Sequence, residues 1–317
     1  MEAALIAILS GFLGGLGGVG YKVSNLGKVS TLQTAAVIAF FGAAFFGLRA
    51  AYLEEWSLFC WQTGALAFAS GFSQYLALVL FAWALKRVPL SLVWCASSVE
   101  FMPGLLFAWL AFGEPMSSWR WAGLAALLGA ILVASFSGGE EGGQNGEKDG
   151  QPGERRPSGG VMLAALIALP LLFGGLFVCM KWGAHLPMPG SPEKVLMDAT
   201  GNVFMCLVYL TMLVTCALHV TCSREWSFTP LGGGGCALAT IPTVASFFLQ
   251  LCIVVEAPAA VVFALTYSMS MLSAALLSTL FLKEKRTPTW YATLGLSLTA
   301  VLFISEVIPW AWERLMA

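Results

Sequence analysis

Charged residues are scarce in this sequence, and their scarcity sets its class. Asp, Glu, Lys and Arg make up 10% of the 317 residues, and 58% of the residues are hydrophobic. A soluble domain carries about 25% charged residues. A soluble chain this apolar would leave much of its apolar surface facing water, so we expect the surrounding solvent to be lipid. The net charge of −1 gives no electrostatic reason to expect a nucleic acid partner.

Residues that build catalytic and metal sites are equally few. The chain has two His, and its only Asp residues are Asp149 and Asp198. The eight Cys show no CxxC spacing and lie in apolar runs, where Cys behaves as a small hydrophobe. No glycine-rich loop is followed by the Lys-Ser or Lys-Thr of a nucleotide-binding loop. We therefore expect no metal and no cofactor, and paired catalytic groups for an intramembrane enzyme are hard to find.

Long apolar runs recur along the whole chain. A helix needs about 20 apolar residues to cross the hydrocarbon core of a bilayer. Ten runs meet or approach this length, separated by charges, Gly and Pro. The first lacks the basic flank of a signal peptide, so we interpret it as a membrane helix. The ten predicted helices are Ala3–Tyr21, Thr31–Leu48, Gln62–Leu85, Leu90–Phe112, Trp119–Phe136, Val161–Met180, Val195–His219, Cys236–Val255, Ala259–Leu282 and Trp290–Ile304.

One polar segment divides the ten runs into five and five. Residues 137–160 are rich in Gly, Glu and Pro and cannot bury enough apolar surface to fold, so we predict a disordered linker. This division predicts a first repeat at 1–136 and a second at 161–317. Shifting residues 75–135 by 170 positions aligns them without a gap on 245–305, with Glu114 on Glu284. Repeats of five helices must enter the membrane in opposite directions, an arrangement typical of secondary transporters.

The stretch Ala84–Ser135 also resembles a known family. Ser98-Val99-Glu100 and Pro103 lie where that family has a Ser-Leu-Glu-Pro-like stretch, and Gly113-Glu114 and Trp121-Ala122-Gly123 match its following Gly-Glu pair and Trp-containing helix. On these motifs the chain resembles the drug/metabolite transporter superfamily, and its EamA-type ten-helix members in particular. The second half follows the pattern more loosely, since Lys283-Glu284 replaces Gly-Glu. The resemblance implies an all-α membrane protein of two inverted five-helix repeats with a carrier role, and it implies no substrate.

Polar residues inside the apolar runs are the candidate site. Glu100 lies near the centre of Leu90–Phe112, where a carboxylate costs at least about 2.5–3.5 kcal/mol to insert, so we expect it to bind solute or couple transport to protons. The alternative is a hydrogen-bonded Glu that supports helix packing. Further polar residues could line a cavity or join helices. These are Gln74, Tyr75, Ser97, Ser98, Asn202, Tyr209, Gln250, Tyr267, Ser268 and Ser270.

Two Lys and two Glu end helices at related positions of the halves. Lys22 and Lys181 each follow a Gly-Gly pair and close the first helix of their half. They could contact an anionic solute from related positions, although snorkelling to the interface is the interpretation we favour. For Glu114 and Glu284 we favour termination of one helix and a charge at the start of the next over a gating ion pair.

The expected function is secondary transport of a small organic solute by alternating access. The alternatives are an intramembrane enzyme and a non-transporting sensor or assembly subunit. The expected partners are the solute and the lipid bilayer, with a homodimer left open, and the expected location is the plasma (cytoplasmic) membrane. Most of the 16 Lys and Arg lie in odd-numbered loops, which by the positive-inside rule puts both termini outside, whereas the resemblance implies cytoplasmic termini.

Overall fold

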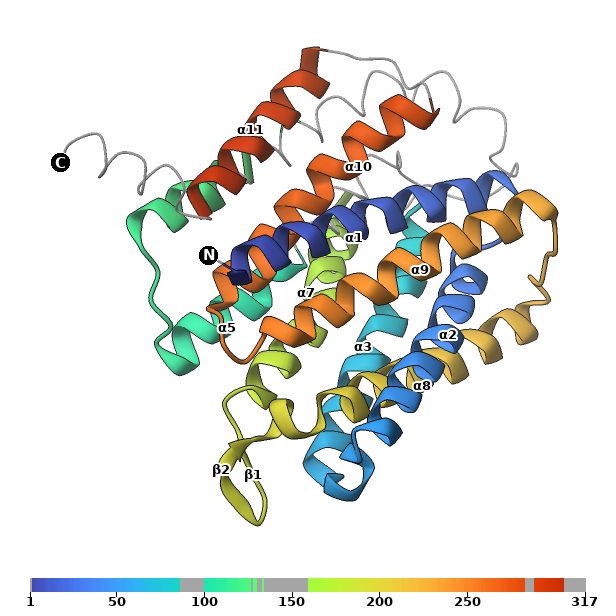
Figure 1. Ribbon diagram of the computed structural model, residues 1–317. Coiled ribbons are helices and arrows are strands. Elements are labelled where there is room, and N and C mark those ends of the chain that lie inside the picture. Colours follow the sequence, from blue (N-terminus) through green and yellow to red (C-terminus); the bar gives the residue numbers. More distant parts are fainter. Residues whose placement is uncertain are drawn as a thin grey trace.

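The computed structural model describes residues 2–85, 100–126, 128–129, 133, 159–282 and 288–304. In these residues the chain is a bundle of helices with one small hairpin (Figure 1). The first half contains α1 (Glu2–Leu26), α2 (Thr31–Tyr52), the 3-10 helix η1 (Glu55–Leu58), α3 (Trp61–Leu85) and α5 (Phe101–Phe112), and residues 118–126 are also helical. The second half contains α7 (Gly159–Gly183), α8 (Leu196–Ser223), α9 (Pro230–Ile253), the π-helical turn η2 (Ala260–Leu265), α10 (Thr266–Leu282) and α11 (Pro288–Ile304).

The class of helical membrane protein is confirmed. Six helices of the described chain are long and apolar enough to cross a bilayer, and three more are apolar but shorter. Large apolar side chains face outward along them, as lipid contact requires; Leu48, Ile241 and Phe281 are 74%, 72% and 69% exposed. Parts of the predicted helices Leu90–Phe112 and Trp119–Phe136, and the predicted linker as far as residue 158, lie outside the described residues. The total of ten crossings therefore stays a prediction.

Local capping explains where several helices begin. Ser30 and Thr229 cap α2 and α9, since their hydroxyls accept the backbone N–H groups of Gln33 and Gly232. The predicted start of the eighth helix at Cys236 is wrong, because α9 already begins at Pro230 and carries four consecutive glycines in its first turns. A proline is well suited to the first position of a helix.

Two other boundaries differ from the sequence prediction. α7 begins at Gly159, inside the segment predicted as linker. The loop between α7 and α8 contains a hairpin of β1 (Pro187–Met188) and β2 (Ser191–Val195), paired antiparallel. Gly190 lies between the strands with φ of 83°, a conformation that favours glycine. The hairpin is visible beside α7 and α8 in Figure 1.

The helices of one half pack mainly against helices of the other. α1 packs on α9 and α10, α7 packs on α3 and α5, and α2 packs on α8. α3 also contacts α8, and α2 also contacts α9. The contacts are symmetric if α1 corresponds to α7, α2 to α8, α3 to α9 and α5 to α10. The contact of α1 with α9, for example, then has its counterpart in the contact of α7 with α3. Two related repeats predict this symmetry of contacts.

A close glycine contact occurs at equivalent positions of the two halves. An ideal Cβ on Gly15 of α1 would lie 2.6 Å from the carbonyl oxygen of Ser270, and one on Gly174 of α7 would lie 2.7 Å from that of Glu100. Ser270 is the position that the shift of 170 assigns to Glu100. Backbones approach this closely only where Cβ is missing. Ser270 therefore occupies in the second half the place that Glu100 holds in the first.

Candidate functional site

A central cavity lies between the two halves. Its volume is about 200 Å³. In the described chain its wall takes residues from α1, α2, α3 and the start of α5, and from α7, α8, α9 and α10. Each half thus supplies part of the wall, as expected for a site between related repeats. The polar residues in the wall are Tyr21, Thr31, Gln74, Glu100, Tyr209, Thr243, Ser246, Gln250, Thr266, Tyr267 and Ser270.

Glu100 lies at the edge of this cavity. It directly precedes α5, and its side chain is half-buried because it borders the cavity. The N-terminus of a helix carries a partial positive charge, which favours a carboxylate at this position. The Tyr267 hydroxyl donates a hydrogen bond to the Glu100 carboxylate across the boundary between the halves. The start of α5 acts on the carboxylate only through this partial charge, because the Glu100 side chain makes no capping hydrogen bond to the helix.

Aromatic rings fix the position of Tyr267. Its ring stacks on Phe101 at 6.1 Å between centroids and meets Phe177 edge-on at 5.3 Å. Phe177 packs in turn against Phe263 of η2 at 4.9 Å. π-helical turns often occur at functional sites, and η2 lies immediately before α10, which carries Tyr267.

Four of the predicted site residues line the cavity, namely Glu100, Gln74, Tyr267 and Ser270. Gln74 is held by a hydrogen bond from its Nε2 to the carbonyl of Phe173, 2.7 Å away. Tyr209 and Gln250, also noted in the sequence, lie in the wall as well. Tyr21 and Ser246 were not singled out, because a Tyr at a helix end and a Ser in an apolar run are common structural features.

Other predicted site residues lie away from the cavity wall. The Tyr75 hydroxyl is 3.1 Å from Nδ1 of His219, which joins α3 to α8. Ser268 is fully buried and donates to the carbonyl of Ala264 in its own helix, 2.7 Å away. Lys22 is half-buried near the end of α1 and does not belong to the lining. Ser97 and Ser98 lie outside the described residues.

Asn202 belongs to a separate polar cluster with Glu55, a residue that no sequence pattern marks as part of a site. The backbone N–H of Asn202 donates to Oε2 of Glu55 at 2.9 Å, and its side-chain amide donates to the other oxygen. α8 has non-helical angles at Thr200, so a second helix start follows this residue. Glu55 therefore caps the main body of α8, as a carboxylate at a helix N-terminus does. A Glu-Glu pair in a loop gave no sign of this partner.

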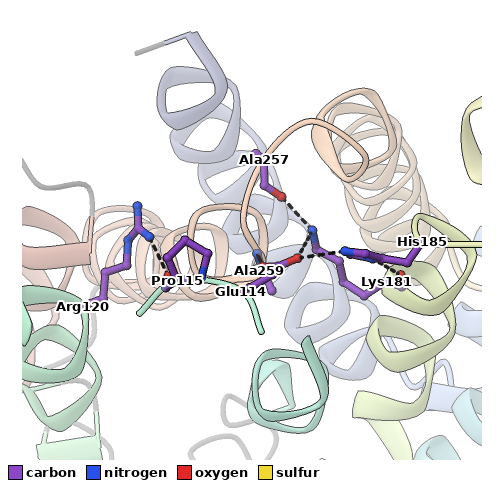
Figure 2. Close-up of polar contacts among 7 residues, drawn as sticks. All are labelled: Glu114, Pro115, Arg120, Lys181, His185, Ala257 and Ala259. Carbon is purple, nitrogen blue, oxygen red and sulfur yellow. Dashed lines mark hydrogen bonds and ion pairs between the residues drawn. The ribbon is translucent and has the colours of Figure 1, made fainter. Parts of the chain in front are cut away.

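Lys181 forms a buried ion pair. Its Nζ lies 2.8 Å from Oε1 of Glu114 and donates to the carbonyl of Ala257 at 2.7 Å, while its side chain is 2% exposed (Figure 2). Glu114 also accepts the backbone N–H of Ala259, and Nε2 of His185 lies 3.8 Å away. The favoured interpretations of Lys181 as a snorkelling residue and of Glu114 as a helix-end charge are therefore wrong. α5 packs against α7, and this contact brings the two charges together.

The ion pair lies at one end of the cavity. Phe177 in the wall is one helical turn before Lys181 on α7, and Phe263 packs against it. The pair thus ties the end of α5 to the end of α7 and to the loop between α9 and η2 (Figure 2). In the described part of the chain no group of three His, Cys, Asp or Glu could hold a metal ion.

Known proteins resemble the chain in two ways. Residues 1–136 match the model of the EamA-like transporter family. A solved crystal structure aligns with 100% of this chain over 99% of the length of that structure's chain. The TM-score is 0.66 and the sequence identity is 16%, which shows a shared fold over both halves. No curated protein matches the sequence. The first half of this multi-pass membrane protein is thus similar to the EamA-like transporter family, and the fold of the whole chain is shared with a solved structure.

Proposed function

We propose that this protein is a secondary carrier that moves a small organic solute across the membrane by alternating access. The observation that carries the proposal is Glu100, a carboxylate at the edge of a cavity whose wall comes from both halves. A carboxylate within the membrane is costly and is usually functional. A site between the repeats can be exposed to either side when one half rocks against the other.

Glu100 is the proposed solute-binding or coupling group. A carboxylate that loses its proton only when a partner charge is present can link solute movement to proton movement. The conservative change Glu100→Gln keeps the size and the acceptor for Tyr267 but removes the exchangeable proton. We expect this variant to lose the pH dependence of transport. Transport with an unchanged pH dependence in Glu100→Gln would contradict proton coupling through this residue.

The Glu114–Lys181 ion pair is the proposed closure of one end of the pathway. It joins α5 of the first half to α7 and the α9–η2 loop of the second half. Opening this end requires these segments to separate, so the pair must break in each transport cycle. A buried ion pair has two discrete states, made and broken, and can serve as a two-state element.

Transport can be tested while the substrate is still unidentified. Proteoliposomes containing the protein are loaded with a mixture of small organic metabolites, and the contents lost over time are identified by mass spectrometry. Empty liposomes and proteoliposomes with Glu100→Gln are the controls. We expect one or a few solutes to leave faster with the wild-type protein than with either control. Equal loss from all three preparations would contradict the carrier proposal.

A further inference from the structure

We propose that the solute carries a protonated amine on a small apolar body, and that this ammonium group binds between Glu100, Gln250 and Tyr209. The inference rests on the proposed carrier function and names the substrate class of the same cavity. It follows from three properties of the wall: its charge, its free hydrogen-bond acceptors and its aromatic surface.

The charge of the wall is of one sign. Of the described lining residues, Glu100 is the only Asp, Glu, Lys, Arg or His. Lys181, the nearest basic residue on α7, is already paired with Glu114. An anionic solute would meet a carboxylate and no described counter-charge in a low-dielectric site, which is costly. A cationic solute would instead neutralise Glu100.

Unpaired polar atoms in the wall favour a hydrogen-bond donor. Gln250 and Tyr209 are each 2% exposed, and Gln250 Oε1 and the Tyr209 hydroxyl have no hydrogen-bond partner in the described structure. A buried polar group without a partner costs about 1–3 kcal/mol, so a native protein keeps one for a reason. Gln250 lies on α9 and Tyr209 on α8, and both residues line the cavity. An ammonium group has three N–H donors, enough for these two acceptors and for Glu100.

Three donors of the wall are already in use. Tyr267 donates to Glu100, and Nε2 of Gln74 donates to the carbonyl of Phe173. The Thr266 hydroxyl bonds to the carbonyl of Val262 in the preceding turn. A solute carboxylate or phosphate needs several donors, and these three groups cannot supply them without losing their present bonds. The Glu100 carboxylate and the unpartnered Oε1 of Gln250 can only accept hydrogen bonds, and they therefore favour a solute that donates.

Aromatic rings form the rest of the wall. Phe81, Phe173, Phe177 and Phe247 all line the cavity, together with the tyrosines. Aromatic faces attract cations, most strongly where water is excluded. The same rings provide an apolar surface for the body of the solute. A wall with a single carboxylate among aromatic rings thus fits an amine whose remainder is apolar.

The test uses four solutes that share a phenylethyl body: 2-phenylethylammonium, 2-phenylethanol, 3-phenylpropionate and phenylalanine. Each is added to the detergent-purified protein, and the melting temperature is followed as a function of concentration. A ligand of the native state raises this temperature by mass action. We expect a saturable rise with the ammonium compound and little or none with the alcohol, the anion or the zwitterion. A rise of equal size with any of these three would overturn the proposed class.

Variants locate the binding site. Glu100→Gln should weaken binding of 2-phenylethylammonium about ten- to a hundredfold, because hydrogen bonds to charged groups are the strong ones. Gln250→Leu should also weaken it, since the N–H then loses an acceptor. Tyr75→Phe is the matched control: it removes a hydroxyl that bonds to His219 outside the cavity and should leave binding unchanged. Unchanged binding in Glu100→Gln would place the amine elsewhere and overturn the proposal.

A transport assay distinguishes an error in the proposed amine class from an error in the proposed carrier function. Proteoliposomes are assayed for exchange of labelled 2-phenylethylammonium, phenylalanine, 3-phenylpropionate and 2-phenylethyltrimethylammonium, each against the same solute unlabelled on the other side of the membrane. Exchange of phenylalanine or 3-phenylpropionate in the absence of amine binding would overturn the amine class and leave the carrier function standing. Amine binding that needs Glu100, with no exchange of any solute, would support the class and contradict transport. The trimethyl compound has the charge but no N–H, so we expect it to exchange more slowly than the amine itself.

Discussion

The Glu114–Lys181 ion pair makes a quantitative prediction about stability. Lys181→Met keeps the length of the side chain and removes its charge, leaving the Glu114 carboxylate with the backbone N–H of Ala259. Glu114→Gln does the converse and leaves the ammonium with the carbonyl of Ala257. The double variant removes both charges at once. Comparing the four proteins isolates the energy of the pair from the effects of each side chain.

The expected magnitude follows from burial. Removing one partner of a buried ion pair costs about 3–5 kcal/mol, because the other charge stays buried without compensation. The Lys181 side chain is 2% exposed, whereas Glu114 is 13% exposed and retains a backbone donor. We therefore expect Lys181→Met to cost about 3 kcal/mol, at the lower end of that range. The double variant should cost less than the sum of the two single variants, by about 1–3 kcal/mol.

The assay is thermal unfolding of the purified protein in detergent. One kcal/mol corresponds to about 2 °C for a chain of this size, so Lys181→Met should unfold about 6 °C below the wild type. Lys194→Met is the matched control, because the same substitution is made at an exposed position of the hairpin; it should change the free energy of unfolding by less than about 0.5 kcal/mol. Additive effects of the two single substitutions would refute the ion pair as an energetic unit.

Three further substitutions test other contacts. Gly20→Leu should prevent folding, measured as loss of monodisperse protein, because a Cβ on Gly20 would lie 2.2 Å from the backbone nitrogen of Ala239. Glu55→Ala should lower the free energy of unfolding by about 1–3 kcal/mol, since the start of the α8 body at Asn202 loses its cap; the melting temperature measures this. Tyr75→Phe should cost only about 0.6 kcal/mol, typical of a hydrogen bond between membrane helices, and should leave transport unchanged.

The course of the helices could be predicted because the bilayer demands long apolar runs. α1, α2 and α3 lie within a few residues of their predicted bounds. The start of α9 could not be predicted, because four consecutive glycines usually indicate a loop. Here Thr229 caps the helix, and Gly235 permits close contact with the backbone at Ser24 of α1. That contact depends on tertiary packing, which local sequence does not encode.

The candidate site was predictable only in part. Glu100 stands out because a carboxylate inside an apolar run is costly wherever it points. Tyr75 and Tyr209 could not be told apart, since helices that are apolar all round give no sign of which face meets a cavity. The partner of Lys181 was hidden for another reason. Glu114 lies far from it in sequence, and only the packing of α5 on α7 brings the two charges together.

Two-sided access to the central cavity is the claim that the carrier account depends on most. A single cysteine at Ser270, in the wall, is introduced into a chain whose eight native cysteines are replaced, and a membrane-impermeant thiol reagent is applied to one side of oriented vesicles at a time. Ser57→Cys, at an exposed position of η1, is the control and should react from one side only. The account predicts that the Ser270→Cys variant reacts from both sides. Reaction from a single side under every condition would contradict alternating access.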